Sequence, residues 1–309
     1  MPVVSVIIPN YNHAGYLNQR IESVLAQTFQ DFELIILDDC STDNSQEIIE
    51  QYRHHPKLQS IVYNTANSGS TFRQWAKGIE LCRGAYVWIA ESDDWCEPAF
   101  LETVLNGMMK ADPCVIGYCQ SYCIEKENVI RWQSAHSRLN EVIDGQDFIT
   151  QKMLTSTAIF NASMAVWKRE VYSLVTNEYT NYRYCGDWLF WIELSRHGSV
   201  YISGKLLNYF RKHDQDVTSK ATLRGGQIIE IINMFNLIYK RGWIDQKRYL
   251  AALKSIYIHY KAISKSLDES MRQKINAVFF YDASVKAFLR RAHLAVYSRY
   301  AVKKLFRLN

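Results

Sequence analysis

Apolar, β-branched segments alternate with amphipathic segments through roughly the first third of the chain. The apolar segments cover residues 3–9, 32–39, 58–64 and 85–90, and the segments between them carry apolar residues at helical spacing. Strands that are apolar throughout are buried on both faces, as in a parallel sheet with helices on either side. The alternation therefore predicts an α/β fold with a Rossmann-like, mixed but mainly parallel sheet flanked by helices.

The middle of the chain has a less regular pattern. Residues 114–125 predict short strands, and a helix is expected near residues 145–154. Residues 186–197 predict an amphipathic helix with an acid at its start, and residues 199–213 predict two short strands. From about residue 224 we expect helices to the end, which adds a C-terminal helical extension to the sheet.

The composition is that of a soluble globular protein. Of 309 residues, 48% are hydrophobic and 22% are charged. The chain has no apolar run long enough to span a membrane, and its first residues, MPVVSVIIPNYN, lack the basic start of a signal peptide. We therefore expect a cytoplasmic protein. Its seven cysteines show no CxxC pair and no Cys/His zinc pattern, which predicts reduced, mostly buried thiols.

The net charge of +5 is concentrated at the C-terminus. Residues 285–309 contain seven lysines and arginines and no acid, so the rest of the chain carries a net charge of −2. Apolar residues recur near helical spacing in this segment, and a basic amphipathic helix can contact an anionic membrane, here its inner face. The alternative is a helix that packs on the protein with a solvated basic side. Because no nucleic-acid recognition motif accompanies this charge, we expect no nucleic-acid binding.

Polar residues follow three of the predicted strands. They are Pro9-Asn10-Tyr11-Asn12, Asp38-Asp39 and Glu91-Ser92-Asp93-Asp94. Ligands of parallel α/β sheets bind beyond the carboxyl ends of the strands, so we expect these residues to line a site. The chain has neither GxGxxG after the first strand nor GxxxxGK[ST]. A bound phosphate would therefore be held by a metal ion on the acids.

Three acids within four positions follow the buried strand at residues 85–90. Glu91, Asp93 and Asp94 repel one another unless a positive charge lies among them. Carboxylate oxygens are suitable ligands for Mg²⁺ or Mn²⁺. The sequence therefore predicts a metal site, and the alternative is a solvated acidic loop ahead of Pro98.

These motifs, in this order, resemble the family 2 glycosyltransferases of the GT-A fold. VSVIIPNYN, FELIILDDCSTDNS, NSGS and KGIELCRGAYVWIAESDDWCEP follow one another across residues 3–98. GDWLFWIEL at residues 186–194 and NYFRKHDQDVTS at residues 208–219 resemble later motifs of the family. The resemblance covers about the first 220 residues. Any single motif is weak, but the ordered set is specific.

The chain departs from the family pattern at three places. The acidic motif begins with Glu91 instead of the usual Asp, which keeps a carboxylate. Trp75-Ala76 stands where the family often has Arg-Asn, so two polar groups that could touch the nucleotide are missing. Gly186 precedes Asp187 where the family usually has Glu, which leaves the essential Asp in place.

The resemblance implies an inverting, metal-dependent glycosyltransferase. It would move a sugar from a UDP- or dTDP-sugar to a glycan or lipid-linked acceptor, in the synthesis of a bacterial surface polysaccharide. The implied glycosyltransferase domain covers residues 1–223, with a nucleotide-sugar-binding half at 1–98 and an acceptor half at 99–223. Residues 224–309 would form the helical extension.

The resemblance also implies roles for individual residues. Asp187 would be the general base, and Asp39 would accept a hydrogen bond from the N3–H of uracil or thymine. The implied nucleotide-binding residues are Pro9, Tyr11, Asp38, Asp39, Asp93 and Arg211, and the implied ligands of Mg²⁺ or Mn²⁺ are Asp93, Asp94, Glu91 and His213.

Each of these roles has a structural alternative. Asp38-Asp39 is also typical of a turn and cap pair, and Asp187 of a helix N-cap. Arg211 and His213 are equally compatible with a surface loop.

Two other functions remain open at this point. A nucleotidyltransferase would have a Gly-rich, basic phosphate loop after the first strand, where this chain has PNYNHAG. A non-catalytic nucleotide-sugar-binding module would tolerate Glu91 and Gly186, but the intact Asp93 and Asp187 argue against it.

Overall fold

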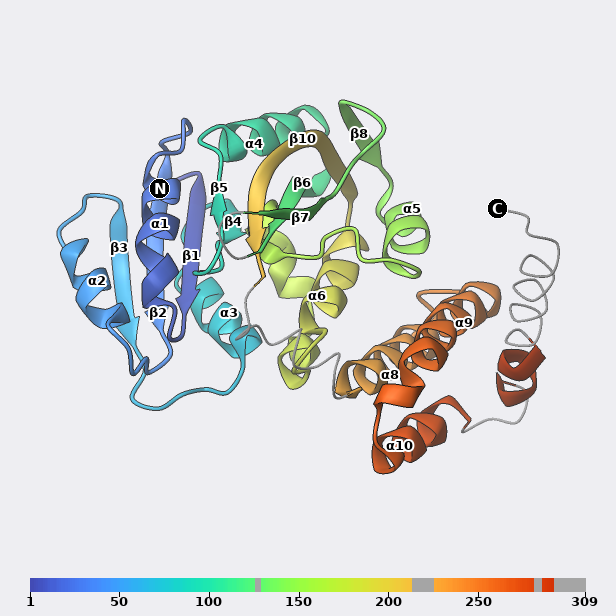
Figure 1. Cartoon of the computed structure of the whole chain (residues 1–309). Helices are drawn as coiled ribbons and strands as arrows, with labels where there is room; N and C mark the ends of the chain where they lie inside the picture. Colours follow the sequence, from blue (N-terminus) through green and yellow to red (C-terminus); the bar gives the residue numbers. More distant parts are fainter. Residues whose placement is uncertain (126–128, 213–224, 281–284, 292–309) are drawn as a thin grey trace. The chain divides into compact units, whose positions relative to one another are not determined.

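The structure is a computed structural model (Figure 1). It describes residues 1–125, 129–212, 225–280 and 285–291. The chain forms two compact units. The first comprises residues 1–149 and 157–214, and the second comprises residues 150–156 and 215–309.

A ten-stranded mixed sheet forms the centre of the first unit, counted over the described residues. The strands are β1 (Val4–Asn10), β2 (Phe32–Asp38), β3 (Leu58–Tyr63), β4 (Tyr86–Ile89), β5 (Trp95–Cys96), β6 (Cys114–Ile124), β7 (Ile130–Gln133), β8 (Asn140–Ile143), β9 (Ala165–Lys168) and β10 (Ser199–Arg211). Their order is β3-β2-β1-β4-β9-β6-β10-β5, and β7 pairs with β6 and β8 with β10. Strands β1 to β4 pair in parallel, which confirms the prediction for this part of the chain.

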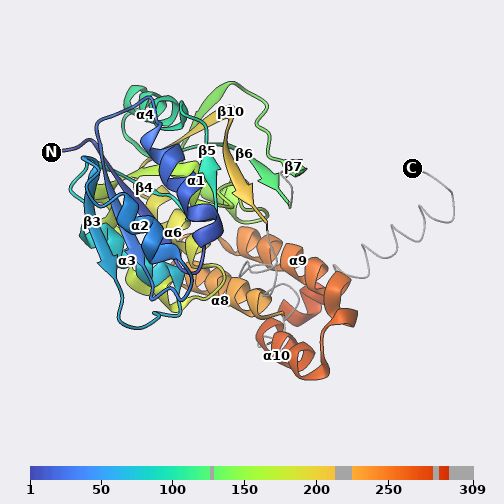
Figure 2. The same cartoon turned by 60° about the vertical axis from the view of Figure 1, so that its left-hand side comes forward.

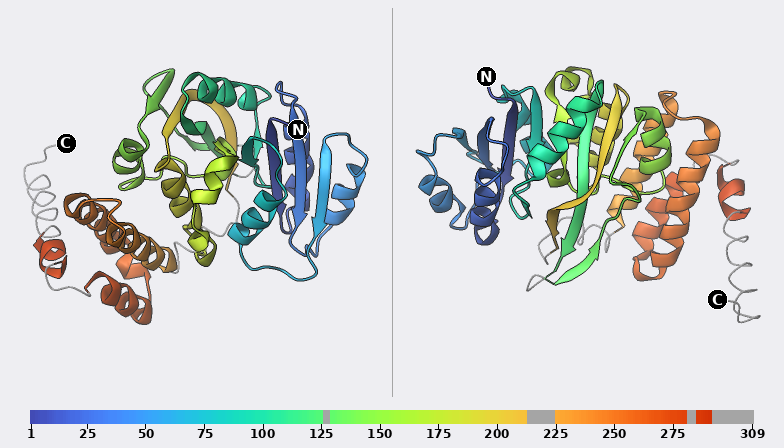
Figure 3. Two further views of the ribbon diagram at one scale, coloured as in Figure 1. Left: turned by 180° about the vertical axis from the view of Figure 1, so that it is seen from behind. Right: turned by 90° about the horizontal axis from the view of Figure 1, so that it is seen from above.

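Helices cover both faces of this sheet (Figures 2 and 3). They are α1 (Ala14–Leu25), α2 (Ser45–Gln51), α3 (Thr71–Glu80), α4 (Phe100–Lys110), α5 (Gly145–Phe148) and α6 (Gly186–Ser195). Trp88 on β4 contacts Phe100 of α4 and lies under Arg20 of α1, so α1 and α4 share one face. Its neighbour Val87 points to the other face, where Trp167 of β9 lies beside it in register and contacts α6.

Strand β10 differs from the prediction of two short strands. It is one strand of 13 residues with register shifts against β6 between Ile202 and Asn208. The bulges bend the strand without ending it, because its pairing with β6 and β8 continues around Gly204. Likewise, the short strands predicted after residue 114 are the single strand β6.

Helix α6 begins at the predicted residue but is not amphipathic. Every residue from Trp188 to Ser195 is buried, including the carboxylate-bearing Glu193. Glu193 accepts hydrogen bonds from the backbone N and Oγ1 of Thr176, which satisfies its charge inside the protein. The helix is therefore a core element, and only its first turn reaches a less buried environment.

The described part of the second unit from Gly226 onward is mainly helical, which confirms the predicted C-terminal helical extension. Its helices are α8 (Gly226–Lys240), α9 (Gln246–Ile263) and α10 (Glu269–Phe279). Asp245 and Asp268 cap the last two by accepting from the backbone N–H of Arg248 and Met271. No helix in the described part of the chain is both long and apolar enough to cross a bilayer.

The basic C-terminal segment is described only as far as Arg291. Val285 and Leu289 are buried, whereas Arg290 and Arg291 are exposed, as in a helix that packs on the protein with a solvated basic side. The tail cations Arg299, Lys303, Lys304 and Arg307 lie outside the described residues. All seven cysteines are free thiols, and all except Cys40 are buried.

Candidate active site

The loops that follow β1, β2 and β4 meet at one edge of the sheet. This follows from the central position of β1, which pairs in parallel with both neighbours. The loops are also bonded to one another. Asn10 Nδ2 donates to Asp38 Oδ1 at 2.8 Å, and His13 Nδ1 lies 2.8 Å from Ser92 Oγ. The structure thus brings together the three polar segments that the sequence places at strand ends.

The segment Glu91–Asp94, here called the acidic loop, folds around a buried arginine. Arg20 of α1 has no exposed side-chain surface. Its Nε donates to the backbone O of Glu91 at 2.8 Å, and its Nη2 lies 4.0 Å from Asp94 Oδ2. Part of the positive charge that the acids require is therefore supplied by the protein. The sequence signal for Arg20 was its position on the buried face of α1, beside Leu17 and Ile21.

Asp94 is held by protein donors on both carboxylate oxygens. Its Oδ2 accepts from Asn161 Nδ2 and from Ser163 Oγ, each at 2.7 Å. Its Oδ1 accepts from the backbone N of Arg211 at 3.0 Å. The side chain is also almost fully buried. These bonds fix the acidic loop to β10 and to the segment before β9. The Oδ1 atom, with one donor, keeps a lone pair, so the role of Asp94 as a metal ligand stays a prediction.

Glu91 and Asp93 make up the rest of the acidic charge. Glu91 Oε1 accepts from Trp75 Nε1 at 2.8 Å. Burial, and next the charge of Asp93, raise the pKa of Glu91 to about 8, although the Trp75 hydrogen bond opposes the shift. Burial and the charge of Asp93 also raise the pKa of Asp94, against the effect of Arg20. Glu91 is therefore mostly protonated at pH 7, and a cation bound at the loop would favour its ionised form.

The donor set fits a metal ion that is shared with a ligand. Among the residues that the structure describes, no group of three or more His, Cys, Asp and Glu side chains is arranged to hold a metal ion. Mg²⁺ and Mn²⁺ usually take only one or two protein carboxylates and complete their shell with phosphate and water. Asp93, half-buried at the tip of the loop, is the carboxylate best suited to that role.

Arg211, at the end of β10, clamps the acidic loop from the other side. Its guanidinium carbon lies 4.4 Å from the ring centroid of Tyr16 and 4.5 Å from that of Trp95. Its Nε donates to the backbone O of Asp93 at 2.8 Å, and its Nη2 donates to Gln19 Oε1 at 2.7 Å. Arg211 is thus beside the predicted site with several donors already in use. His213, the predicted metal ligand next to it, lies outside the described residues.

Asp39 organises the loop that leads into α3. Its Oδ1 accepts from Asn64 Nδ2 at 2.6 Å, from the backbone N of Ser68 at 2.9 Å and from Gln74 Nε2 at 3.0 Å. Its Oδ2 accepts from Ser68 Oγ at 2.7 Å. Oδ2 has one donor where a carboxylate oxygen can accept two, so it is the Asp39 atom with capacity left for a base N–H.

Asp38 serves the turn after β2. Its Oδ1 accepts from Asn10, and its Oδ2 accepts from the backbone N of Ser41 at 3.0 Å and from Gln46 Nε2 at 3.2 Å. The side chain is fully buried. This arrangement matches the turn-and-cap alternative for Asp38.

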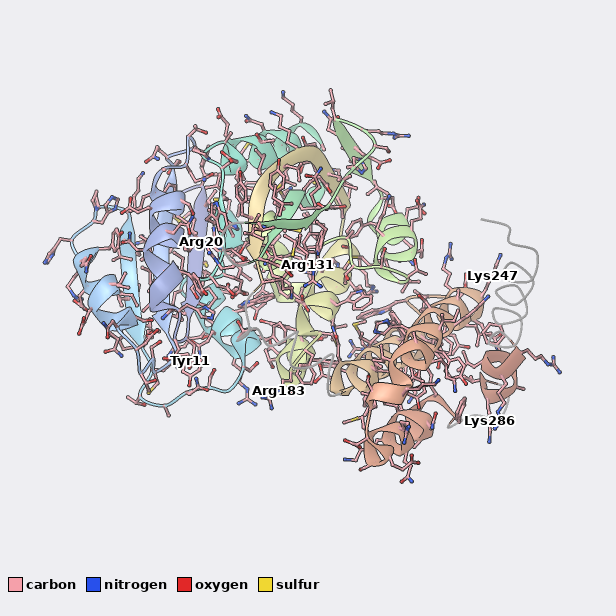
Figure 4. All side chains as sticks on the ribbon, viewed as in Figure 1. Tyr11, Arg20, Arg131, Arg183, Lys247 and Lys286 are labelled. Carbon is pink, nitrogen blue, oxygen red and sulfur yellow. The ribbon has the colours of Figure 1, made fainter. Side chains whose placement is uncertain are left out.

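The two predicted base-lining residues after β1 differ in exposure. Pro9 is a buried residue within β1 itself, so it shapes the strand end from inside. Tyr11 lies one residue beyond β1 (Figure 4). It is 46% exposed. Its ring is therefore the one of the pair with surface left to stack on a planar ligand.

Asp187 lies in the first turn of α6. The N-cap residue is Cys185, so the alternative of Asp187 as the N-cap does not apply. Asp187 shares a helix face with Phe190 and Trp191, three and four residues later. Both of these rings contact Trp75, the residue that bonds to Glu91. Through Trp75, α6 is thus packed against the helix that bonds to the acidic loop.

Gly186 stands where no side chain fits. A Cβ at this position would come within 2.3 Å of the Tyr179 backbone O and 2.6 Å of the Phe72 ring. The departure from the usual Glu before Asp187 is therefore a packing requirement of this chain, in which α3 approaches the start of α6 closely.

Known protein sequences resemble this chain. The sequence profile described as Glycosyl transferase family 2 matches residues 5–175. The Bacillus subtilis protein TuaG, named for teichuronic acid biosynthesis, is 39% identical over 109 residues, or 35% of this chain and 43% of TuaG. Chondroitin synthase from Escherichia coli is 35% identical over 128 residues, or 41% of this chain and 18% of that protein. Each alignment thus spans less than half of the relative.

Solved structures share the fold. S. aureus TarS in complex with UDP-GlcNAc superposes with a TM-score of 0.61 at 16% identity, covering 96% of this chain and 91% of that one. A mannosyltransferase from Pyrobaculum calidifontis, in complex with GDP-Man and Mn²⁺, gives a TM-score of 0.52 at 15% identity, covering 100% and 88%. At these identities the likeness establishes the architecture, which confirms the predicted α/β class.

Proposed function

The chain belongs to glycosyl transferase family 2, and we propose that it is an inverting, metal-dependent enzyme acting on a UDP- or dTDP-sugar. The acceptor would be a glycan or a lipid-linked saccharide in the synthesis of a bacterial surface polysaccharide. This proposal is supported by the names of TuaG and chondroitin synthase and by the UDP-GlcNAc bound to TarS. The observation that carries it is that α3 contacts three parts of the proposed site: Gln74 donates to Asp39, and Trp75 donates to Glu91 and packs on α6.

Asp93 is the proposed protein ligand of Mg²⁺ or Mn²⁺, with Glu91 in support. The metal, when bound, supplies positive charge to the leaving diphosphate. The Mn²⁺ in the structure of the Pyrobaculum mannosyltransferase supports this choice of ion. The conformation of the acidic loop would be maintained by Arg20 and Arg211, whose hydrogen bonds hold the loop backbone and the buried carboxylate of Asp94.

Asp187 is the proposed general base. It would accept the proton of the acceptor hydroxyl as that hydroxyl attacks the anomeric carbon, and a single displacement of this kind inverts the configuration. The first turn of a helix suits a carboxylate that must stay ionised, since the helix dipole favours negative charge there.

The nucleoside would lie over the ends of β1 and β2. Tyr11 offers an exposed ring for the base, and Asp39 Oδ2 would accept the base N3–H beside the Ser68 hydroxyl. Pro9 and Asp38 would shape this end of the pocket from beneath. Arg211 would stand beside the diphosphate as well as holding the acidic loop.

A lipid-linked acceptor would bring the enzyme to the inner face of the membrane. The cations of residues 285–309 would then favour anionic lipid. We propose this peripheral contact, and a cytoplasmic site of action, as part of the same function.

Release of nucleoside diphosphate from a panel of UDP-, dTDP- and GDP-sugars, with and without Mn²⁺, tests the function. The proposal expects Mn²⁺-dependent release of UDP or dTDP by the wild type, and loss of release in Asp93→Ala and Asp187→Asn. Because the chain belongs to glycosyl transferase family 2, we do not retain the nucleotidyltransferase alternative. Equal release by wild type and both variants, or no release from any sugar nucleotide, would favour the non-catalytic binding module.

A further inference from the structure

We propose that Trp75 is a positioning residue that sets the nucleotide–metal site by holding Glu91 of the acidic loop and the Asp187 turn of α6 in one arrangement. The inference rests on the proposed function for the identity of the ligand, a nucleoside diphosphate with a divalent cation. Its structural basis is a set of contacts around one indole ring.

The first contact is a buried hydrogen bond. Trp75 Nε1 donates to Glu91 Oε1 at 2.8 Å, and the indole is only 2% exposed. Indole has a single N–H donor, so the whole hydrogen-bonding capacity of Trp75 goes to the acidic loop. Water cannot replace this partner without entering the core. The bond therefore fixes the direction of the Glu91 carboxyl group, two residues before the proposed metal ligand Asp93.

The remaining contacts join the same ring to α6. The Trp75 ring centroid lies 5.8 Å from that of Phe190 and 6.4 Å from that of Trp191. These two residues follow Asp187 by three and four positions and lie on its face of the helix. Trp75 thus has its N–H on the acidic loop and its ring on the helix that carries the proposed base.

Helix α3 holds the start of α6 at a second point. Phe72, edge-to-face with Trp75 at 5.2 Å, lies where a Cβ on Gly186 would come within 2.6 Å of its ring. The turn that begins with Gly186 and Asp187 is therefore packed directly against α3. A shift of Trp75 would therefore move both the acidic loop and this turn.

The length of the Glu91 side chain is matched to Trp75. The backbone at Glu91 is fixed, because its N donates to Ser163 Oγ at 3.0 Å and its O accepts from Arg20 Nε at 2.8 Å. From this backbone an aspartate, shorter by one methylene, would fall short of the indole N–H. Glu91 and Trp75, which the sequence shows as two separate departures from the family pattern, are thus one bonded pair.

Calorimetric binding of UDP in the presence of Mn²⁺ tests the proposal, using the full chain. Trp75→Phe removes the N–H but keeps an aromatic ring, and Glu91→Asp removes the reach of the carboxylate. We expect each variant to weaken UDP–Mn²⁺ binding by about fivefold to tenfold, as loss of one buried hydrogen bond implies. We expect the double variant to bind no more weakly than the weaker single variant, because both remove the same bond.

Trp167→Phe is the matched control. Trp167 is also a buried tryptophan that contacts Phe190, but its indole N–H has no partner among the described residues. Trp167→Phe should leave the affinity for UDP–Mn²⁺ unchanged. Its melting temperature shows how much thermal stability a Trp→Phe change loses in this core. If Trp75→Phe has a much lower melting temperature than this control, its binding result is not used. The UDP–Mn²⁺ affinity of Glu91→Asp, which leaves the aromatic packing intact, then tests the inference.

Wild-type affinity in Trp75→Phe and Glu91→Asp would overturn the inference, and so would penalties that add in the double variant. Either result leaves the proposed function standing. Failure of the wild type to bind UDP, dTDP or GDP with Mn²⁺ is a different result, because it would overturn the proposed function together with the inference.

Discussion

Arg20 Nη2 lies 4.0 Å from Asp94 Oδ2, and neither side chain has any exposed surface. The two residues come from α1, which covers one face of the sheet, and from the loop after β4. Arg20 also donates to the backbone of Glu91. This pair explains how the chain holds three acids at the end of a buried strand before any ligand arrives.

Replacing Arg20 by Met should destabilise the fold strongly. Removal of one partner leaves Asp94 buried without its counter-charge, which typically costs about 3–5 kcal/mol. Urea unfolding of the wild type and the variant measures the difference in unfolding free energy. Arg53→Met, at an exposed pair with Glu50, should change it little. Equal stability of Arg20→Met and wild type would mean that Arg20 does not balance the acidic loop.

Glu33 on β2 should make the fold sensitive to acid. Burial acts to raise its pKa, but hydrogen bonds from Ser5 and from Arg83 outweigh burial and lower it below the model-compound value of 4.5. A carboxyl group with a lowered pKa in the folded state contributes stability above its unfolded pKa, and this contribution is lost as pH falls through the folded value.

Glu33→Gln tests this dependence. The variant should be less stable than wild type at pH 7, and the gap should narrow when unfolding is measured below about pH 4. A gap that stays constant between the two pH values would show that Glu33 stabilises the fold by packing and not by its charge.

Gly186 should tolerate no side chain. Alanine there would force its Cβ against the Tyr179 carbonyl and the Phe72 ring, and overpacking of this kind costs about 1–3 kcal/mol. Gly186→Ala should therefore unfold at lower urea, and Gly186→Glu, the usual family residue, at lower urea still. Gly15, whose Cβ would meet nothing within 4 Å, provides the control as Gly15→Ala. Equal effects of the two alanine variants would contradict the close approach of α3 and α6.

Asp187→Asn should separate catalysis from binding. Loss of a general base lowers kcat by about 10²–10⁴-fold, whereas UDP binding should be unchanged because the proposed base acts on the acceptor hydroxyl. Steady-state turnover and calorimetric UDP binding, measured on the same preparation, check both halves of the prediction. Normal turnover in this variant would remove Asp187 from the reaction.

The strands and helices of the first third of the chain were predictable because their signals are local. The pattern of apolar residues in these strands and helices predicts which residues are buried. Parallel pairing then brings the polar strand ends together at one edge of the sheet. Strand β10 was harder, since Gly204 and the residues around it look like a turn. Only the pairing partners on β6 and β8 keep that strand continuous.

The partners of the acidic loop could not be predicted in this way. Asn161 and Ser163 lie 67 and 69 residues from Asp94 along the chain, and nothing near them in the sequence marks a site. Arg20 had a signal, a charge on an apolar helix face, but its partner is set by the fold. In the sequence, Trp75 stood out only as a departure from the family pattern. Its hydrogen bond to the acidic loop is a tertiary contact, which the sequence alone does not show.

The most direct test is calorimetric titration of UDP into wild type and Asp93→Ala, each with and without Mn²⁺. A metal held between Asp93 and the diphosphate predicts that Mn²⁺ tightens UDP binding to wild type by about tenfold or more, and that Asp93→Ala loses this gain. Asp112→Ala, at an exposed acid paired with Lys168, should bind as wild type does. Equal affinity of the wild type for UDP with and without Mn²⁺ would contradict the account.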